Sequence, residues 1–586
     1  MKSTRLGTLP YALLALLATG ARAGVDNPTP ENFIRRFYAS AVVLGEYLYI
    51  DGGELGQLVN GVQSQPSYPV NGTLSVSLKS AWTNETVTMR YIKKSAPLQN
   101  QQVVWVNPST SSFFAWGGMT ADSGPAAEKE VWKFTADGFG SGDWSQAIPY
   151  SVVAFNDAHR TVSSAFTSVD GVGYSIGGTM KSTVDSSITD GNETAVQGII
   201  TFDMGSMDWA NLSSAGMGPY GTTMNGRLEY VPFGPKGFLV VLGGSVPPVG
   251  VLSQYAQQDW NNIWIMDLGT KKWHHQAVSG SKPTNRERFC TIGTQGLNGT
   301  YEIFIHAGYS TPTADTASDV FVLSLPGFVM FKSPNSGTPR QDHACVAIGG
   351  NSSSTSQRQM LVVGGLNGAR ANAAMDPDPW ARGLGIFDMT EMVWSSSYDP
   401  QAAVYDSPAV VKTWYSQGGL DAVNWANDEV KTLFVSGTNS SANNGNGTST
   451  SSGDSSTPIG SSGAGMGNNN TGAILGGTIG GACGLAIIGV LSFLLWRQRK
   501  RLQATQQQQY DVPPDLDKTS ADGTTHVWNP QSSASPAEMP AWPRQPVEVD
   551  RTQQPVEADG TQRPVEADGA PMWYELPDQG YAHQAR

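Results

Sequence analysis

Five histidines lie before residue 437, and they are the side chains best suited to bind a metal ion or transfer a proton: His159, His274, His275, His306 and His343. The consecutive pair His274 and His275 lies on or beside a predicted strand, so the two rings point to opposite faces and suit one shared ion poorly. The sequence contains no HExxH, no Walker A pattern and no G-x-S-x-G. We interpret the histidines as structural or surface residues and expect no catalytic residue, no cofactor and no metal site.

The elements that would position such side chains follow one repeated pattern, with a period of roughly 60 residues. In each unit a short β-branched or aromatic strand ends in Gly-Gly, and a tryptophan follows at a nearly constant distance. The glycines are Gly52, Gly53, Gly117, Gly118, Gly177, Gly178, Gly243, Gly244, Gly364 and Gly365, with Ala307-Gly308 at the fifth place. The tryptophans are Trp82, Trp144, Trp209, Trp273 and Trp394, with Phe331 near the fifth place.

These residue types have a coherent physical reading. Glycine accepts a positive φ and a close approach of another backbone, and tryptophan supplies a large apolar plate between neighbouring sheets. One four-stranded sheet cannot bury both of its faces, whereas sheets stacked around an axis can. The repeat therefore predicts a closed ring of β-sheets.

The pattern resembles the kelch repeat over about residues 36–398. This resemblance implies an all-β fold, a kelch-type β-propeller with six blades and long loops between strands. Seven blades are the alternative, if residues 402–435 with Trp414 and Trp425 build another sheet; we interpret that stretch as a packing extension. Kelch-like propellers include galactose oxidase, whose copper is held by Tyr and His ligands beside a Tyr–Cys cross-link, but those ligands have no residue-by-residue match here.

Two of the three cysteines, Cys290 and Cys345, occupy what we interpret as equivalent places in the first strands of the fifth and sixth units. In an oxidising compartment this placement predicts a disulfide bond; two buried free thiols are the alternative. No pair among these two and Cys483 has the spacing of zinc ligands.

Two hydrophobic segments predict the compartment. Residues 1–23 have a basic start, a short apolar run and an Ala21-Arg22-Ala23 cleavage site, which is typical of a signal peptide; a short membrane anchor is the alternative. Residues 473–496 are apolar and uncharged, long enough to span ~30 Å of hydrocarbon, and basic residues follow. We expect a type I plasma-membrane protein: signal peptide 1–23, extracellular propeller with its C-terminal extension 24–436, Ser/Thr/Gly/Asn-rich stalk 437–472, transmembrane helix 473–496 and disordered cytoplasmic tail 497–586.

Glycosylation sequons agree with this topology because all of them precede the predicted helix: Asn71, Asn84, Asn192, Asn211, Asn298, Asn351, Asn439, Asn446 and Asn469. Within that helix, Gly476, Gly480 and Gly484 share one face that would let a second copy pack closely as a homodimer; ordinary glycine usage in membrane helices is the alternative.

The whole plan resembles kelch-repeat single-pass membrane proteins of filamentous fungi, and the stalk and helix also resemble those of fungal cell-wall stress sensors. A net charge of −13 argues against nucleic acid as a partner. We expect a non-enzymatic cell-surface protein that binds an extracellular glycan or protein ligand in wall sensing or adhesion. The tail could dock a cytoplasmic partner, and an unselected low-complexity tail is the alternative. A surface oxidase of the galactose-oxidase type and a structural wall-spanning protein are the alternatives.

The place of recognition is predicted on the long insertions 57–69, 180–195 and 245–259, which include Tyr68 and Tyr255, since loops commonly carry binding residues. Polar residues at the starts of the units could form a binding ring, but we interpret them as structural: Arg36, His159, Arg160, Arg227, Arg288, Arg340 and His343.

Overall fold

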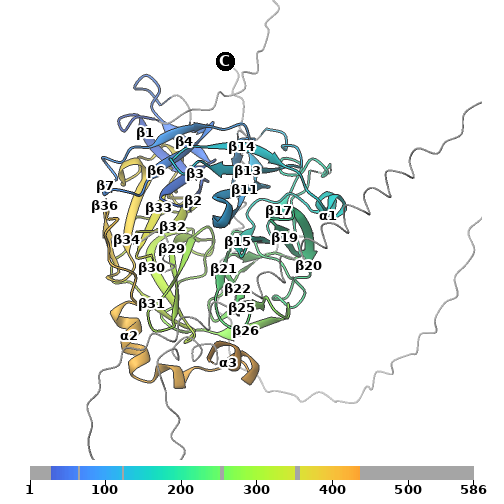
Figure 1. Ribbon diagram of the computed structural model, residues 1–586, viewed down its shortest axis with the longest axis vertical. Helices are drawn as coiled ribbons and strands as arrows, with labels where there is room; N and C mark the ends of the chain where they lie inside the picture. Colours follow the sequence, from blue (N-terminus) through green and yellow to red (C-terminus); the bar gives the residue numbers. More distant parts are fainter. Residues whose placement is uncertain are drawn as a thin grey trace, which may run out of the picture. The chain divides into compact units, whose positions relative to one another are not determined.

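The computed structural model describes residues 28–435, except 64–65, 122–123, 190, 251, 253–255 and 350–356. These residues lie in one compact unit, Met1–Gly453. Within them, six sheets of at least four strands surround a common axis (Figure 1). This is a six-bladed propeller, as the repeat predicted.

In each blade the main strands follow chain order from the inner strand outward. Blade one has β2 (Ser40–Leu44), β3 (Tyr47–Asp51), β6 (Gly72–Ser77) and β8 (Arg90–Lys93). Blade two has β10 (Val103–Asn107), β11 (Ser112–Trp116), β13 (Val131–Ala136) and β14 (Gly142–Ala147). Blade three has β15 (Ala165–Val169), β16 (Val172–Ile176), β19 (Ile199–Asp203) and β20 (Asp208–Leu212).

The other three blades follow the same order. Blade four has β21 (Arg227–Val231), β22 (Phe238–Leu242), β25 (Asn262–Asp267) and β26 (Trp273–Ala277). Blade five has β28 (Cys290–Gln295), β29 (Tyr301–Ser310), β30 (Asp315–Leu325) and β31 (Val329–Lys332), and β27 (Ser279–Gly280) adds a parallel edge. Blade six has β32 (Ala344–Ile348), β33 (Gln359–Val363), β34 (Leu384–Asp388) and β35 (Val393–Ser395).

Short elements connect the blades. One three-stranded sheet contains β1 (Phe33–Phe37), β4 (Glu54–Gln57) and β5 (Tyr68–Pro69). Two-stranded ribbons pair β9 (Gln99–Asn100) with β12 (Met119–Thr120), β17 (Thr179–Met180) with β18 (Thr194–Ala195), β23 (Ser245–Val246) with β24 (Ala256–Gln257), and β7 (Trp82–Thr83) with β36 (Ser397–Tyr398). The helical turns outside the C-terminal extension are α1 (Val152–Asp157), η1 (Pro108–Thr110), η3 (Ala373–Met375) and η4 (Ala381–Gly383).

The Gly-Gly pairs join each blade to the next one. They follow the second strand of their blade, and both glycines have a positive φ. The N–H of the second glycine donates to a backbone carbonyl of the following blade: Gly53 to Gln99 (3.1 Å), Gly118 to Thr161 (2.8 Å), Gly178 to Thr223 (2.7 Å), Gly244 to Arg286 (3.0 Å), Gly308 to Arg340 (2.9 Å) and Gly365 to Arg36 (2.7 Å). The last of these bonds runs from blade six to the segment that leads into blade one and closes the ring.

The fifth unit departs from the glycine pair without losing this bond. Ala307 takes the first glycine's place with a φ of 60°, and a register shift between His306 and Gly308 marks a bulge. Because the bulge bends the strand instead of ending it, β29 continues to Ser310.

A separate apolar cluster fills each of the six spaces between blades. Trp144, Trp209, Trp273 and Trp394 lie on the outermost strands and pack into these clusters. Trp82 differs: it lies on β7, which pairs with β36, so it contributes to the closure between blades six and one.

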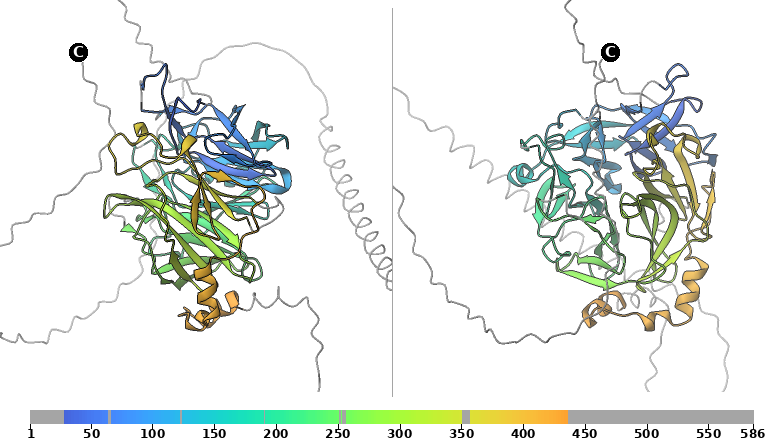
Figure 2. Two further views of the ribbon diagram at one scale, coloured as in Figure 1. Left: turned by 90° about the vertical axis from the view of Figure 1, so that its left-hand side faces the viewer. Right: turned by 180° about the vertical axis from the view of Figure 1, so that it is seen from behind.

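Residues 402–435 build helices and no seventh sheet. They contain α2 (Ala409–Ser416), η5 (Gly419–Ala422) and α3 (Asp428–Val435), which lie beside the propeller (Figure 2). Phe434 is fully buried and stacks on Phe238 of blade four, with ring centroids 4.8 Å apart. The stretch is therefore a packing extension.

Several predictions fall on residues that the structure does not describe. They are the signal peptide 1–23, the stalk 437–472, the helix 473–496 with Gly476, Gly480 and Gly484, the tail 497–586, and the sequons Asn351, Asn439, Asn446 and Asn469. Among the described residues, no helix combines the length and the apolar character needed to cross a membrane.

The described sequons differ in their surroundings. Asn192, Asn211 and Asn298 are exposed, and Asn71 is half-buried. Asn84 is buried, and its Nδ2 donates to the Leu384 carbonyl at 2.9 Å. The expectation of a glycan at Asn84 conflicts with this fold, because the nitrogen that would carry the sugar is enclosed between blades one and six.

Candidate functional site: the axial pocket

Each inner strand is preceded, two positions earlier, by a non-glycine residue with a left-handed backbone. These residues and their φ angles are Tyr38 (61°), Gln101 (52°), Ser163 (63°), Asn225 (57°), Arg288 (58°) and Asp342 (55°). A positive φ is uncommon for side-chain-bearing residues, and it persists only where the surrounding structure imposes it. We call these six residues the axial collar.

Backbone hydrogen bonds run from one collar residue to the next and impose that conformation. The N–H groups donate to the neighbouring carbonyl in the pairs Tyr38 to Asp342 (3.0 Å), Asp342 to Arg288 (3.0 Å), Arg288 to Asn225 (2.9 Å), Asn225 to Ser163 (2.7 Å) and Gln101 to Tyr38 (3.3 Å). Since each bond joins two blades, the collar fixes one side chain per blade around the axis.

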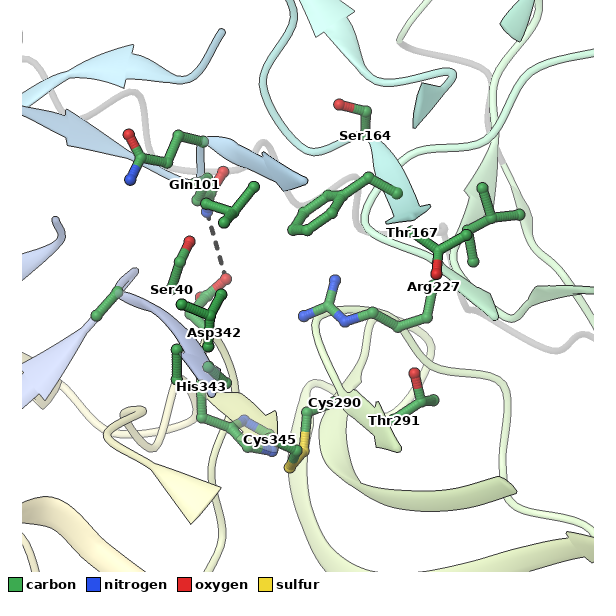
Figure 3. A pocket seen from close by; sticks show the side chains of 18 of the residues that line it. Ser40, Gln101, Ser164, Thr167, Arg227, Cys290, Thr291, Asp342, His343 and Cys345 are labelled. Carbon is green, nitrogen blue, oxygen red and sulfur yellow. Dashed lines mark hydrogen bonds between the residues drawn. A yellow bond between two sulfur atoms is a disulfide. The ribbon is translucent and has the colours of Figure 1, made fainter. Parts of the chain in front are cut away.

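All six collar residues line a single cavity of about 380 Å³. Figure 3 shows this pocket from close by and labels Gln101 and Asp342 of the collar. Residues within the first three positions of the inner strands help to complete its wall and include Phe166, Arg227, Glu229 and both cysteines. This volume falls within the ~300–1,000 Å³ of small-molecule sites. The pocket thus combines hydroxyl, amide, guanidinium and carboxylate groups with aromatic surface.

One side of the pocket holds a compensated charge network. Arg288 Nη1 lies 3.3 Å from Asp342 Oδ2, and Arg288 Nε lies 3.4 Å from Glu287 Oε1. Gln101 Nε2 donates to Asp342 Oδ1 at 3.3 Å (Figure 3). Burial and the nearby Asp342 raise the pKa of Tyr38, an effect that Arg288 opposes, so the Tyr38 hydroxyl stays neutral and can donate.

The other side carries a cation without a matched anion. Figure 3 shows Arg227 reaching from β21 into the pocket. Its Nη1 donates to the Gly226 carbonyl at 3.0 Å. Within the described residues Arg227 forms no ion pair, although the charges of Asp342 and Glu229 act on it over a longer distance. Burial raises the pKa of nearby Glu229 to about 7, although Thr291 and Arg227 oppose that shift. Below pH 7, Glu229 is therefore largely neutral and leaves the Arg227 charge uncancelled.

The predicted disulfide is present in the pocket wall. Cys290 and Cys345 are bonded, with a Cα–Cα distance of 5.6 Å. Their places are not equivalent, however, because Cys290 is the first residue of its inner strand and Cys345 the second. The bond therefore joins blades five and six at strand positions that differ by one residue.

The histidines divide into two groups. His274 is buried and His275 exposed on β26, so they face opposite sides as expected, and the half-exposed His159 lies 3.7 Å from Asp185. His306 Nδ1 lies 3.2 Å from His343 Nε2, and both rings are buried.

The unit-start residues also divide. Arg160 and Arg340 are buried and hold backbone or ion-pair contacts, such as Arg340 with Asp378 at 3.1 Å, which fits the structural interpretation. Arg36 is buried as well, but its Nε and Nη1 have no hydrogen-bond partner among the described residues. Arg227, Arg288 and His343 instead line the pocket, so the structural interpretation is incomplete for them.

The prediction that Tyr68 and Tyr255 in the long insertions carry recognition gains no support from the described residues. Tyr68 is only 7% exposed and offers no open stacking surface, while Tyr255 lies outside the described residues. The collar residues other than Arg288 were not predicted from the sequence: Tyr38, Gln101, Ser163, Asn225 and Asp342. Their constant place, two residues before each inner strand, was the available signal.

Six blades closed around an axial pocket define a β-propeller. A curated relative, the "Kelch repeat-containing protein" of Arthroderma benhamiae, is 24% identical over 554 residues, covering 81% of this chain and 76% of the relative. This similarity supports a kelch-repeat protein. No protein-family model matches the chain.

Proposed function

We propose that this kelch-type propeller is a non-enzymatic binding protein of the cell surface, and that its axial pocket binds an acidic extracellular glycan. The surface location rests on the predicted signal peptide 1–23 and membrane helix 473–496. The observation that carries the binding proposal is Arg227, a cation without an ion-pair partner among the described residues, in a pocket whose other polar groups are fixed by the collar.

A glycan suits the pocket because sugars present many hydroxyl groups and one apolar face. Gln101, Asn225 and Ser163 offer amide and hydroxyl partners at fixed places around the axis. The rings of Phe166 and Tyr38 add aromatic surface against which a sugar ring can pack. Less ordering is then needed on binding, since backbone hydrogen bonds between blades fix the collar backbone, and the Gln101 and Ser163 side chains are themselves hydrogen-bonded.

An acidic ligand is favoured by the charge distribution. Arg288 is compensated by Asp342 and Glu287, so it has little remaining attraction for an anion. Arg227 has no such partner within the described residues, and a carboxylate can accept two parallel hydrogen bonds from its guanidinium group. A glycan with a carboxylate would neutralise this half-buried charge.

The galactose-oxidase alternative requires a thiol that joins a tyrosine. Cys290 and Cys345 are bonded to each other, so neither offers that thiol in this state. This favours binding over oxidase chemistry. A copper assay of the purified protein, together with oxidase activity, distinguishes the two, because stoichiometric copper with turnover would favour the enzyme.

The proposal is tested with secreted residues 24–436 and paired oligosaccharides that differ only in a carboxylate. We expect saturable binding to an acidic member and a loss of about 10- to 100-fold with Arg227→Gln, since a charge-assisted hydrogen bond contributes ~1.5–3 kcal/mol. Arg370→Gln removes the same charge at an exposed position away from the pocket lining and should bind like the wild type.

Absence of saturable binding across the panel would refute the glycan ligand and leave the wall-spanning structural role as the better reading. Equal affinities of the Arg227→Gln and Arg370→Gln variants would refute the role of the pocket.

A further inference from the structure

We propose that Cys290, Cys345, His306 and His343 form a tetrahedral site for one zinc-class divalent cation when the disulfide is reduced. The proposal is independent of the glycan ligand, because it concerns the wall between blades five and six and not the pocket space. The disulfide and the cation would be alternative cross-links between the same two blades.

The four residues already meet the spatial requirement. One potential ligand atom from each lies within 4.8 Å of all the others. His306 Nδ1 and His343 Nε2 are 3.2 Å apart, close to the ~3.3 Å edge of a tetrahedron built with metal–nitrogen bonds of ~2.0–2.1 Å. The two sulfur atoms would separate to ~3.8 Å for metal–sulfur bonds of ~2.3 Å. Two thiolates and two imidazoles are a zinc donor set.

The two imidazoles face each other through the nitrogen atoms that would bind the ion. Both rings are buried, and a cation between His306 Nδ1 and His343 Nε2 would replace their present contact. The other nitrogen of each ring, His306 Nε2 and His343 Nδ1, has no hydrogen-bond partner among the described residues, and coordination would leave both as they are.

The rings of His306 and His343 are both enclosed by protein. Trp380 and Trp394 lie against His306, with ring centroids 6.3 Å and 5.0 Å away, and make its far side apolar.

The axial pocket gives a reductant access to the sulfur atoms. Cys290 and Cys345 both line it, and Cys345 is half-buried rather than enclosed (Figure 3). Two molecules of a small external thiol would reduce the Cys290–Cys345 bond and leave as their own disulfide, which supplies two electrons and two protons to the cysteines. The cation then displaces both thiol protons, so two thiolates neutralise its charge.

The test uses the full chain with Cys483→Ser, so that only the blade-five and blade-six cysteines remain. The protein is reduced with a phosphine without oxygen, freed of reductant and titrated with Co²⁺ as the probe. We expect one equivalent to bind with the visible bands of tetrahedral Co²⁺ and a thiolate-to-cobalt charge-transfer band. X-ray absorption of the Zn²⁺-loaded protein should show two sulfur and two nitrogen neighbours at ~2.3 and ~2.0–2.1 Å.

Two histidine variants separate coordination from general folding effects. His306→Phe should weaken Co²⁺ binding by at least about 100-fold, since even outer-shell losses cost ~10- to 100-fold. His275→Phe makes the same change at an exposed histidine of β26 and should bind like the parent. Any of four results would overturn the proposal. The two variants could bind Co²⁺ equally well, or the charge-transfer band could be missing. The metal shell could lack two sulfurs, or the cysteines could resist reduction in the folded chain. The X-ray absorption result decides the matter if His306→Phe does not fold.

Discussion

Replacement of Gly177 by alanine tests why the repeat needs its glycines. A Cβ at Gly177 would lie 2.2 Å from the Thr223 carbonyl oxygen and 2.8 Å from the Thr223 nitrogen, which belong to the segment that enters blade four. Its φ of 69° adds a conformational cost. Gly171 is the matched control, since its φ is 78° but nothing lies within 4 Å of its Cβ position.

The magnitudes follow from these two contributions. The left-handed backbone alone costs ~1–2 kcal/mol for alanine, so Gly171→Ala should lose about that much free energy of unfolding. Gly177→Ala carries the same cost and must also push Thr223 away, which disrupts the 2.7 Å bond from Gly178 N–H to the Thr223 carbonyl. A buried backbone group left unpaired costs ~1–3 kcal/mol, so the total should reach about 2–5 kcal/mol.

Chemical denaturation of secreted residues 24–436, followed by tryptophan fluorescence, measures both variants. The difference between them isolates the contact between blades, because the conformational cost is common to both. If the two variants lose the same free energy within about 0.5 kcal/mol, the close approach of blades would not be the reason for glycine at this place.

Three further outcomes follow from the same contacts. Replacing Cys290 and Cys345 together by alanine opens a loop with a sequence separation of 55 and should cost about 4 kcal/mol by loop entropy; a loss below about 1 kcal/mol in denaturation would contradict this. Phe434→Ala should cost about 3–5 kcal/mol because the ring is fully buried, whereas the exposed Val410→Ala should cost under about 0.5 kcal/mol. The pKa of Glu229, raised to about 7, predicts that an acidic glycan binds more weakly as the pH rises from 6 to 8, because ionised Glu229 cancels the Arg227 charge. Glu229→Gln should flatten this pH profile in a binding titration, and an unchanged profile would refute the coupling.

The propeller could be predicted from the sequence because a few residue types have no substitute where its blades meet. A backbone carbonyl approaches Gly177 so closely that only a hydrogen atom fits, which forces the same residue at a constant spacing. The exceptions are local: Ala307 uses a bulge, and Trp82 joins a ribbon that closes the ring. Spacing alone could not place Trp82, because a tryptophan on a ribbon and one on an outer strand look alike in the sequence.

The axial collar could not be predicted, for the opposite physical reason. Its members are Tyr, Gln, Ser, Asn, Arg and Asp, and only Asn and Asp readily adopt a left-handed backbone on their own. The conformation comes from hydrogen bonds donated and accepted across the blades, which are independent of the side chain. A backbone fixed by its neighbours leaves the side chain free to vary, so chemistry can change at these places without loss of the ring. Positions that combine a fixed backbone, variable side chains and a shared cavity are suited to determine which ligand a propeller selects.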